Sequence, residues 1–218
     1  MLTYSSSAYD RSQVQYEAGS SYSDWQKLPY EYLKMGNSED FASVRGYTSN
    51  NYKEINNNLQ KNPVPTKWEY TSKCAASGVS RLPKYQGITY RGWKNMVKKN
   101  EPVSKWNMGQ IWTTASFLST TTDLNVAYVF ADWLYYPSLG SGNLSIVWII
   151  WPSSGSYIRS LSKFPSEYEV LQNPETSYKI LDYYEYWTQN RAEIYVYETT
   201  NGVKSKSEED KILQRLKS

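Results

Sequence analysis

Two glutamates that stand two residues apart, Glu167 and Glu169, are the residues of this sequence whose spacing best suits chemistry. If their segment is a strand, residues two apart point to one face, with Cα atoms about 6.7 Å apart at ~3.3 Å per residue. A carboxylate can stabilise the positive charge that develops on a sugar ring as a glycosidic bond breaks. Neighbouring carboxylates on one strand face are poorly placed to flank a sugar from two sides, which counts against a conventional glycosidase.

The composition excludes most other catalytic chemistries. The chain has no histidine, which excludes Ser-His-Asp triads, Cys-His pairs and histidine-ligated metals. Its single cysteine, Cys74, can form neither an intramolecular disulfide nor a multi-cysteine metal site. We therefore expect no metal, and chemistry that rests on Glu, Asp, Arg, Lys, Ser, Thr and Tyr.

Charge and hydropathy restrict the partners of the chain. The net charge of +3 is too small to indicate a nucleic-acid partner. The longest uninterrupted apolar run, Ile146 to Trp151, is far shorter than the ~20 residues of a membrane-spanning helix. Residues 1–15 are polar and have no apolar stretch of the signal-peptide kind. We expect a monomer without a membrane partner.

The first part of the chain, residues 1–84, predicts mainly helices. Residues 1–24 have weak periodicity and predict a frayed polar arm. A helix begins at Ser38, where a serine cap precedes acidic residues. Two further helices are expected over residues 51–61 and 68–82.

The second part, residues 85–200, predicts a β-rich core. The expected strands cover residues 87–92, 117–121, 145–151, 157–161, 168–171, 178–185 and 193–199. A helix capped by Asp123 or Thr122 is expected to run through Leu134. The charged tail, residues 201–218, is expected to be helical or loose.

Two further short motifs precede the glutamates: Tyr90-Arg91-Gly92 at a predicted strand end, and Phe-Leu-Ser-Thr-Thr over residues 117–121. Taken singly, each of the three motifs has an ordinary structural explanation. Arginines and Ser-Thr runs are common on strands, and two glutamates two apart usually lie on one solvated strand face. In this order, the three motifs resemble the Arg–Ser-Thr-Ser–Glu-x-Glu signature of toxin-type mono-ADP-ribosyltransferases. The resemblance spans about residues 38–200 and extends to the helical segment of clostridial and insecticidal members.

The resemblance implies an α+β fold, with a mixed or antiparallel two-sheet ADP-ribosyltransferase core and an N-terminal helical segment. It implies one domain over residues 1–218, divided into the helical segment 1–84, an NAD-binding core 85–200 and a tail 201–218. Its activity would be transfer of ADP-ribose from NAD to an arginine of a target protein, with actin as the leading candidate. Such a toxin or effector is secreted or delivered into a target cell by a delivery component or as part of a larger toxin.

The resemblance also assigns catalytic roles to Glu169, Glu167 and Ser119. Glu169 would hold the NAD ribose, and Ser119 would fix Glu169 by a hydrogen bond. Glu167 would orient the acceptor, because a glutamate there accompanies arginine modification in the family. Arg91 would bind the NAD diphosphate, which guanidinium suits well. The other expected site residues flank these motifs: Tyr90, Gly92 and Thr120 at NAD, Tyr157 near the nicotinamide, and Phe164, in the loop Ser160–Ser166, at the protein target.

The sequence departs from the family pattern at two positions and leaves alternatives open. Thr121 stands for the third serine, and Gln60 stands where an arginine often follows the second helix. With the same fold, the acceptor could be water, which would make the protein an NAD glycohydrolase, or a non-arginine or nucleic-acid group. A domain with 22 Tyr and 9 Trp could instead bind glycans without chemistry.

Overall fold

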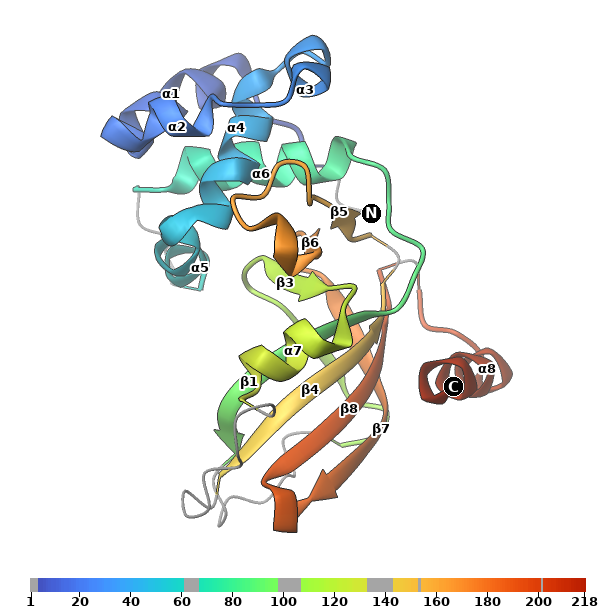
Figure 1. Cartoon of the computed structure of the whole chain (residues 1–218). Helices are drawn as coiled ribbons and strands as arrows, with labels where there is room; N and C mark the ends of the chain where they lie inside the picture. Colours follow the sequence, from blue (N-terminus) through green and yellow to red (C-terminus); the bar gives the residue numbers. More distant parts are fainter. Residues whose placement is uncertain (1–3, 61–66, 98–106, 133–142, 153, 201) are drawn as a thin grey trace. The chain divides into compact units, whose positions relative to one another are not determined.

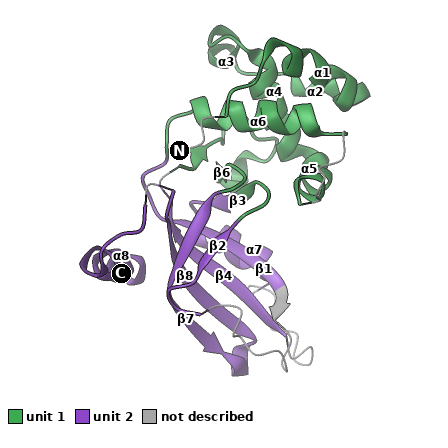
Figure 2. Cartoon of the chain, turned by 180° about the vertical axis from the view of Figure 1, so that it is seen from behind, with its two compact units in different colours: residues 1–84, 114–118, 154–175 green, residues 85–113, 119–153, 176–218 purple. Residues whose placement is uncertain are grey.

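The computed structural model describes residues 4–60, 67–97, 107–132, 143–152, 154–200 and 202–218 (Figure 1). The chain divides into two units, which Figure 2 shows in different colours. Unit 1 comprises residues 1–84, 114–118 and 154–175, and unit 2 comprises residues 85–113, 119–153 and 176–218. Unit 1 therefore contains the predicted helical segment together with two short stretches of the predicted core.

The α-helices of unit 1 lie in its first 84 residues. They are α1 (Ala8–Ala18), α2 (Tyr22–Trp25), α3 (Tyr30–Lys34), α4 (Ser38–Gly46), α5 (Tyr52–Leu59) and α6 (Glu69–Arg81), with the short segments η1 (Gly19–Ser21) and η2 (Tyr47–Asn51). The helices predicted from Ser38, over 51–61 and over 68–82 are confirmed, although Lys61 lies outside the described residues. The predicted serine cap is wrong, because Ser38 is the first helical residue and the N-cap residue Asn37 makes no side-chain capping hydrogen bond.

Residues 8–25 are helical and bury several apolar side chains, so the predicted frayed polar arm over residues 1–24 is wrong. Val14 and Trp25 are 0% and 1% exposed, within the core of unit 1. A capping box begins α1: the Ser7 hydroxyl accepts from the N–H of Asp10, whose carboxylate accepts from the N–H of Ser7. The segment is ordered despite its few apolar residues, because these residues pack against the other helices of unit 1.

Helix α6 is fixed by contacts at its start and in its middle. The carboxylate of Glu17 accepts from the N–H groups of Tyr70 and Thr71, at 3.0 and 2.7 Å, and so caps the helix. At Gly78, a Cβ would lie 2.8 Å from the carbonyl oxygen of Asp40, so glycine permits the close packing of α4 on α6.

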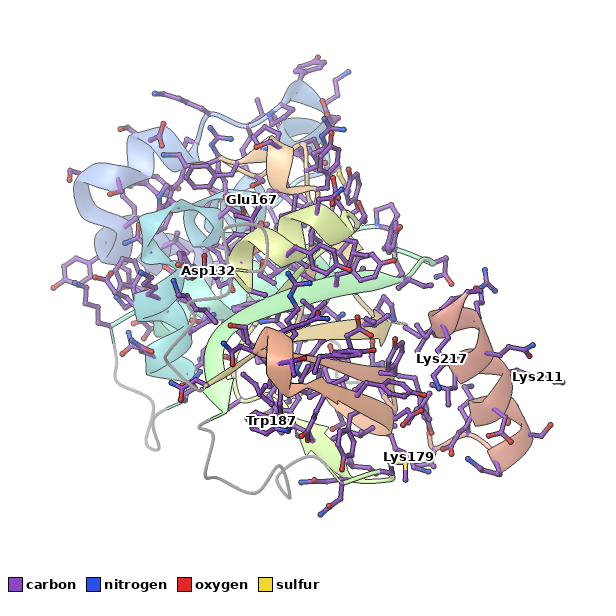
Figure 3. All side chains as sticks on the ribbon, turned by 60° about the horizontal axis from the view of Figure 1, so that its bottom comes forward. Asp132, Glu167, Lys179, Trp187, Lys211 and Lys217 are labelled. Atoms are coloured by element: carbon purple, nitrogen blue, oxygen red, sulfur yellow. The ribbon has the colours of Figure 1, made fainter. Side chains whose placement is uncertain are left out.

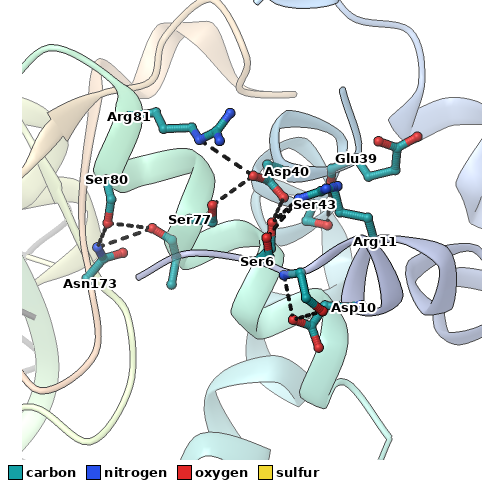
Figure 4. Close-up of polar contacts among 12 residues, drawn as sticks. Ser6, Asp10, Arg11, Glu39, Asp40, Ser43, Ser77, Ser80, Arg81 and Asn173 are labelled. Atoms are coloured by element: carbon teal, nitrogen blue, oxygen red, sulfur yellow. Dashed lines mark hydrogen bonds and ion pairs between the residues drawn. The ribbon is translucent and has the colours of Figure 1, made fainter. Parts of the chain in front are cut away.

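A buried carboxylate lies between α4 and α6 (Figure 4). Asp40 is fully buried and accepts from the hydroxyls of Ser6, at 2.6 Å, and Ser77, at 2.7 Å. The Nε of Arg81 lies 3.9 Å from the same carboxylate. Burial raises the pKa of the neighbouring Cys74 thiol, so this cysteine is a packing residue rather than a nucleophile.

Two short strands complete unit 1. Strands β5 (Ser156–Tyr157) and β6 (Glu169–Gln172) pair antiparallel, with Tyr157 opposite Val170. The predicted strand 157–161 is shorter in the structure because the chain turns after Tyr157. The loop that follows buries Ile158 and Leu161 in the same apolar cluster as the helices.

The strands of unit 2 form a mixed sheet in the order β2-β7-β8-β4-β1-β3. Neighbouring strands are antiparallel except for the parallel pair β4–β8. The strands are β1 (Thr89–Val97), β2 (Ile111–Thr113), β3 (Leu118–Thr121), β4 (Leu144–Trp151), β7 (Ser177–Tyr186) and β8 (Arg191–Glu198). The predicted α+β class, with a mixed sheet and an N-terminal helical segment, is confirmed.

Two helices of unit 2 pack on this sheet, α7 (Leu124–Phe130) and α8 (Lys206–Lys217). They share an apolar cluster with β4 and β8 that includes Ala127, Val147 and Leu216. Helix α7 ends before the predicted Leu134, which lies outside the described residues. Within the described ranges, no helix has the length and apolar character needed to cross a membrane.

Helix α8 forms most of the predicted tail and is attached to the sheet by ion pairs. The Glu209 carboxylate accepts from the Nζ of Lys179, at 2.6 Å, and from the hydroxyl of Tyr197, at 2.8 Å. At the other end of the helix, the Nζ of Lys217 lies 2.7 Å from the Asp182 carboxylate. Lys179 and Lys217 both lie at this contact (Figure 3), and the tail is therefore an ordered part of unit 2.

Candidate active site

Arg91 and Ser119 meet in unit 2 because β1 and β3 pair antiparallel, with Tyr90 opposite Thr121. The Nη1 of Arg91 donates a hydrogen bond to the carbonyl oxygen of Ser119. The guanidinium carbon also lies 4.9 Å from the ring centre of Trp93, in a cation–π contact. The two contacts fix the direction of a half-buried cation, as binding of an anionic group requires.

An aromatic cluster surrounds Arg91 on this face of the sheet. The ring centres of Trp93 and Trp148 lie 5.1 Å apart, and those of Trp112 and Trp148 lie 4.9 Å apart. Burial raises the pKa of Tyr178, and the nearby Arg91 charge opposes that rise. Aromatic surroundings lower the local dielectric constant, so the Arg91 charge acts more strongly than it would in water.

The Ser-Thr-Thr segment of β3 divides into one accessible and two buried residues. Ser119 is half-buried, whereas Thr120 and Thr121 are 3% and 5% exposed. The Oγ1 of Thr121 accepts from the N–H of Asp123, which in turn caps α7 through its own carboxylate. This arrangement agrees with a supporting role for the threonines, and contact of Thr120 with NAD stays a prediction.

Tyr90 and Gly92 flank Arg91 and lie against α7. Tyr90 packs with the apolar cluster that includes Ala127, and burial raises the pKa of its hydroxyl. At Gly92, a Cβ would lie 2.0 Å from the carbonyl oxygen of Ala127, so the glycine permits α7 to contact β1 directly. Both residues thus have a structural role, and their predicted contacts with NAD stay predictions.

The two glutamates do not share a strand face, which corrects the geometry expected from the sequence. Strand β6 begins at Glu169, and Glu167 ends the short helical turn η4 (Pro165–Glu167). Between them, Tyr168 has a φ of 49°, a left-handed conformation that breaks the strand alternation. The two carboxylates therefore have different surroundings. Glu169 is 4% exposed, whereas Glu167 is half-buried and desolvation raises its pKa.

The loop that precedes the glutamates is held by the helices of unit 1. The N–H of Lys163 donates to the Oγ1 of Thr48 at 3.0 Å, and the hydroxyls of Ser160 and Tyr32 lie 2.5 Å apart. Phe164, by contrast, is 48% exposed. The loop thus presents a large aromatic side chain to solvent on a fixed backbone, which agrees with the predicted contact to a protein target.

The predicted site residues are divided between the two units. Arg91 and Ser119 belong to unit 2, and Glu167 and Glu169 belong to unit 1. Tyr157 also belongs to unit 1, where it is 37% exposed. The predicted hydrogen bond from Ser119 to Glu169 and the predicted contact of Tyr157 with nicotinamide stay predictions.

One protein-family model matches this sequence over almost its whole length. The model of the ADP-ribosyltransferase exoenzyme family matches residues 19–214. The chain belongs to the ADP-ribosyltransferase exoenzyme family. The resemblance drawn from the three motifs is thereby confirmed, as is the predicted enzyme class at the level of the family. NAD is the substrate from which ADP-ribosyltransferases take ADP-ribose, so the predicted NAD is confirmed at that level too.

Two curated relatives carry names of the same class. A protein of Mycobacterium avium (strain 104) that carries the name NAD(+)–arginine ADP-ribosyltransferase Mav is 28% identical over 134 residues, which are 62% of this chain and 15% of the relative. The NAD(+)–protein-arginine ADP-ribosyltransferase Tre1 of Serratia proteamaculans (strain 568) is 28% identical over 149 residues, 66% of this chain and 29% of the relative. These matches span less than a third of the length of either relative.

Solved structures of a type III effector and of an ADP-ribosyltransferase share the fold. The type III effector XopAI of Xanthomonas axonopodis pv. citri superposes with a TM-score of 0.67 at 22% identity, over 89% of each chain. The ADP-ribosyltransferase Vis of Vibrio splendidus, solved in complex with agmatine, superposes with a TM-score of 0.61 at 22% identity, over 92% of this chain and 90% of Vis.

Sequence reasoning missed the residues of this ADP-ribosyltransferase domain that support the glutamate loop. Tyr32, Thr48 and Arg45 hydrogen-bond the loop although they stand more than a hundred residues upstream. Only the family resemblance of the helical segment pointed to a role for this region. Among the residues that the structure describes, no group of three or more His, Cys, Asp or Glu side chains could hold a metal ion.

Proposed function

We propose that this protein is an NAD-dependent mono-ADP-ribosyltransferase that modifies an arginine side chain of a target protein. The observation that carries the proposal is the unlike environment of the two glutamates. Glu169 is 4% exposed at the start of β6, and Glu167 is half-buried with a raised pKa. Two carboxylates with different surroundings can serve two different steps of one transfer reaction.

Glu169 serves the cleavage of NAD. When the bond to nicotinamide breaks, positive charge develops on the ribose, and nicotinamide leaves as a neutral group. A buried carboxylate held against a ribose hydroxyl stabilises that charge more strongly than an exposed one. This step needs no general acid, which suits a chain without histidine.

Glu167 serves the acceptor. A guanidinium group donates hydrogen bonds in a planar fork, which a carboxylate can accept and orient. Because desolvation raises the pKa of Glu167, its carboxylate has a higher affinity for the proton that the guanidinium loses as it attacks. In this proposal, Arg91 binds the NAD diphosphate, with its guanidinium already directed by Ser119 and Trp93.

Other proteins support arginine as the acceptor class. Both curated relatives carry arginine in their names, and Vis was solved in complex with agmatine, a small guanidinium compound. By this proposal the protein acts as a toxin or effector in the cytosol of a target cell, delivered by other polypeptides or domains. Actin is the target that the resemblance to clostridial and insecticidal toxins favours.

The test is nicotinamide release from NAD by the purified protein, with and without agmatine. Glu169→Gln is expected to lose both hydrolysis and transfer, because the ribose cation loses its counter-charge. Glu167→Gln is expected to lose transfer by about 10²–10⁴-fold, the usual contribution of a general base, and to keep NAD hydrolysis. Glu31→Gln, at an exposed glutamate of α3, is the matched control.

The outcomes separate the candidate functions. Agmatine transfer that depends on both glutamates supports the arginine transferase. If NAD is cleaved but agmatine is not modified, the assignment of the fold stands, and the acceptor is water or a chemically different group. Full-rate transfer by Glu169→Gln would remove the assignment of catalysis to this site.

A further inference from the structure

A cationic pocket lies in unit 1, beside the turn that ends at Glu167. It has a volume of about 610 Å³ and is open to solvent. Its lining includes Arg45 at the end of α4, Tyr157 of β5, and Arg159 and Pro165 of the loop between β5 and β6. Tyr157 is predicted to lie near the nicotinamide, but no step of the proposed chemistry uses Arg45 or Arg159.

The positive charge of the pocket is only partly balanced. The guanidinium of Arg45 donates to the carbonyl oxygens of Asp24 and Leu161, at 3.2 and 3.3 Å, and these bonds leave its charge uncompensated. Lys163, which also lines the pocket, pairs with the Asp24 carboxylate and lowers its pKa. Among the described residues, neither Arg45 nor Arg159 pairs with a carboxylate.

Arg159 links the pocket to the glutamates. Its guanidinium carbon lies 4.4 Å from the ring centre of Tyr168, which stands between Glu167 and Glu169 in the chain. A guanidinium in a cation–π contact still has N–H groups that can bind a carboxylate with two parallel hydrogen bonds. An anion bound here would therefore lie close to the residue that receives the acceptor.

We propose that this pocket binds an acidic side chain of the protein that carries the acceptor arginine, an inference that rests on the proposed transferase function. The protein then selects arginines that have an aspartate or glutamate nearby. A protein carboxylate is favoured over a nucleotide phosphate because the same loop exposes Phe164, which is 48% exposed and suited to a protein contact.

The test compares synthetic peptides that contain one arginine and one glutamate at successive distances from it, each beside its glutamine counterpart. The measured quantities are kcat and KM for ADP-ribosylation of each peptide and of agmatine, and the KM for NAD. The variants are Arg159→Glu, the neutral Arg159→Gln, and Lys53→Glu as the control, since Lys53 is an exposed cation of α5 in the same unit.

The expected result is a preference of the wild type for one glutamate position over glutamine by about tenfold in kcat/KM, typical of a charge-assisted hydrogen bond. Arg159→Glu and Arg159→Gln should abolish that preference through KM, and Lys53→Glu should keep it. Agmatine has no carboxylate to place in the pocket, so its turnover reports whether the variants are folded.

Three results would overturn the inference. Equal kcat/KM for glutamate and glutamine peptides at every distance would show that no acidic side chain is read. If Arg159→Glu kept the preference for the glutamate peptide, the glutamate would be bound at another part of the protein. If the Arg159 variants had a raised KM for NAD and kept the peptide preference, the anion bound in the pocket would be a nucleotide phosphate. A wild type that modifies neither peptides nor agmatine would instead reject the transferase function itself.

Discussion

At the scale of single residues, the backbone at Tyr168 gives two identical side chains different chemical properties. Its φ of 49° ends the turn that carries Glu167 and lets β6 begin at Glu169. Glu169 is consequently buried, and Glu167 remains half-buried beside the exposed Phe164. Desolvation disfavours the charged form of Glu167 and raises its pKa from 4.5.

This raised pKa predicts an acid limb in the pH profile of transfer. The carboxylate form of Glu167 accepts the proton, so agmatine transfer should fall as pH falls through the raised pKa, by about tenfold per pH unit below it. The measurement is kcat for agmatine against pH, beside residual NAD hydrolysis by Glu167→Gln, which should lack this limb. A limb that begins only below 4.5 would contradict the prediction.

The same shift fixes the expected sign of the stability effect. A carboxyl whose folded-state pKa is raised disfavours folding once pH exceeds its unfolded pKa, because the folded state binds the proton more tightly. Glu167→Gln removes that unfavourable charge, so its Tm at neutral pH should not fall. A lost activity with an unchanged or higher Tm then reports chemistry rather than unfolding.

At the scale of elements, the contact of α7 with β1 depends on Gly92. A Cβ at this position would lie 2.0 Å from the Ala127 carbonyl oxygen, and that backbone atom cannot rotate away as a side chain could. Gly92→Ala should therefore shift α7 and lower the free energy of unfolding by roughly 1–3 kcal/mol, the usual cost of overpacking.

Urea unfolding checks this prediction, with Val129→Ala as the control. Val129 lies on α7 but is 49% exposed, so its truncation should change stability by less than about 0.5 kcal/mol. Equal stability of Gly92→Ala and the wild type would show that α7 can move without cost. The glycine beside Arg91 would then need an explanation at the site itself.

The elements that the sequence predicted best are those whose own residues determine them. The apolar run 145–151 became β4 because both of its faces are buried. The start of α4 at Ser38 is likewise a local property, because Glu39 and Asp40 place negative charge in its first turn. In contrast, α1 has a polar sequence, and its burial depends on distant partners, as when Glu17 caps α6. Such a pairing has no signal in the local sequence.

At the scale of the whole molecule, some contacts of the candidate site follow from the local sequence, and others depend on distant parts of the chain. The contact of Arg91 with Ser119 could be predicted, because two recognised motifs lie on paired strands. The support of the glutamate loop could not, because unit 1 is assembled from three separate stretches of the chain. Leu161 and Leu171 belong to the same apolar cluster as Val14 and other residues of the helical segment.

The N-terminal helices should therefore determine whether the glutamate loop is ordered. Deletion of residues 1–25 removes Val14 and Trp25 from the cluster that buries the loop, so hydrogen exchange over residues 154–175 should accelerate and nicotinamide release should be lost. Deletion of residues 206–218 is the matched control, because α8 packs on the sheet of unit 2. It should accelerate exchange in the strands of that sheet and leave residues 154–175 protected. If the N-terminal deletion left that protection unchanged, α1 and α2 would be accessory to the catalytic loop, and their burial would need a separate explanation.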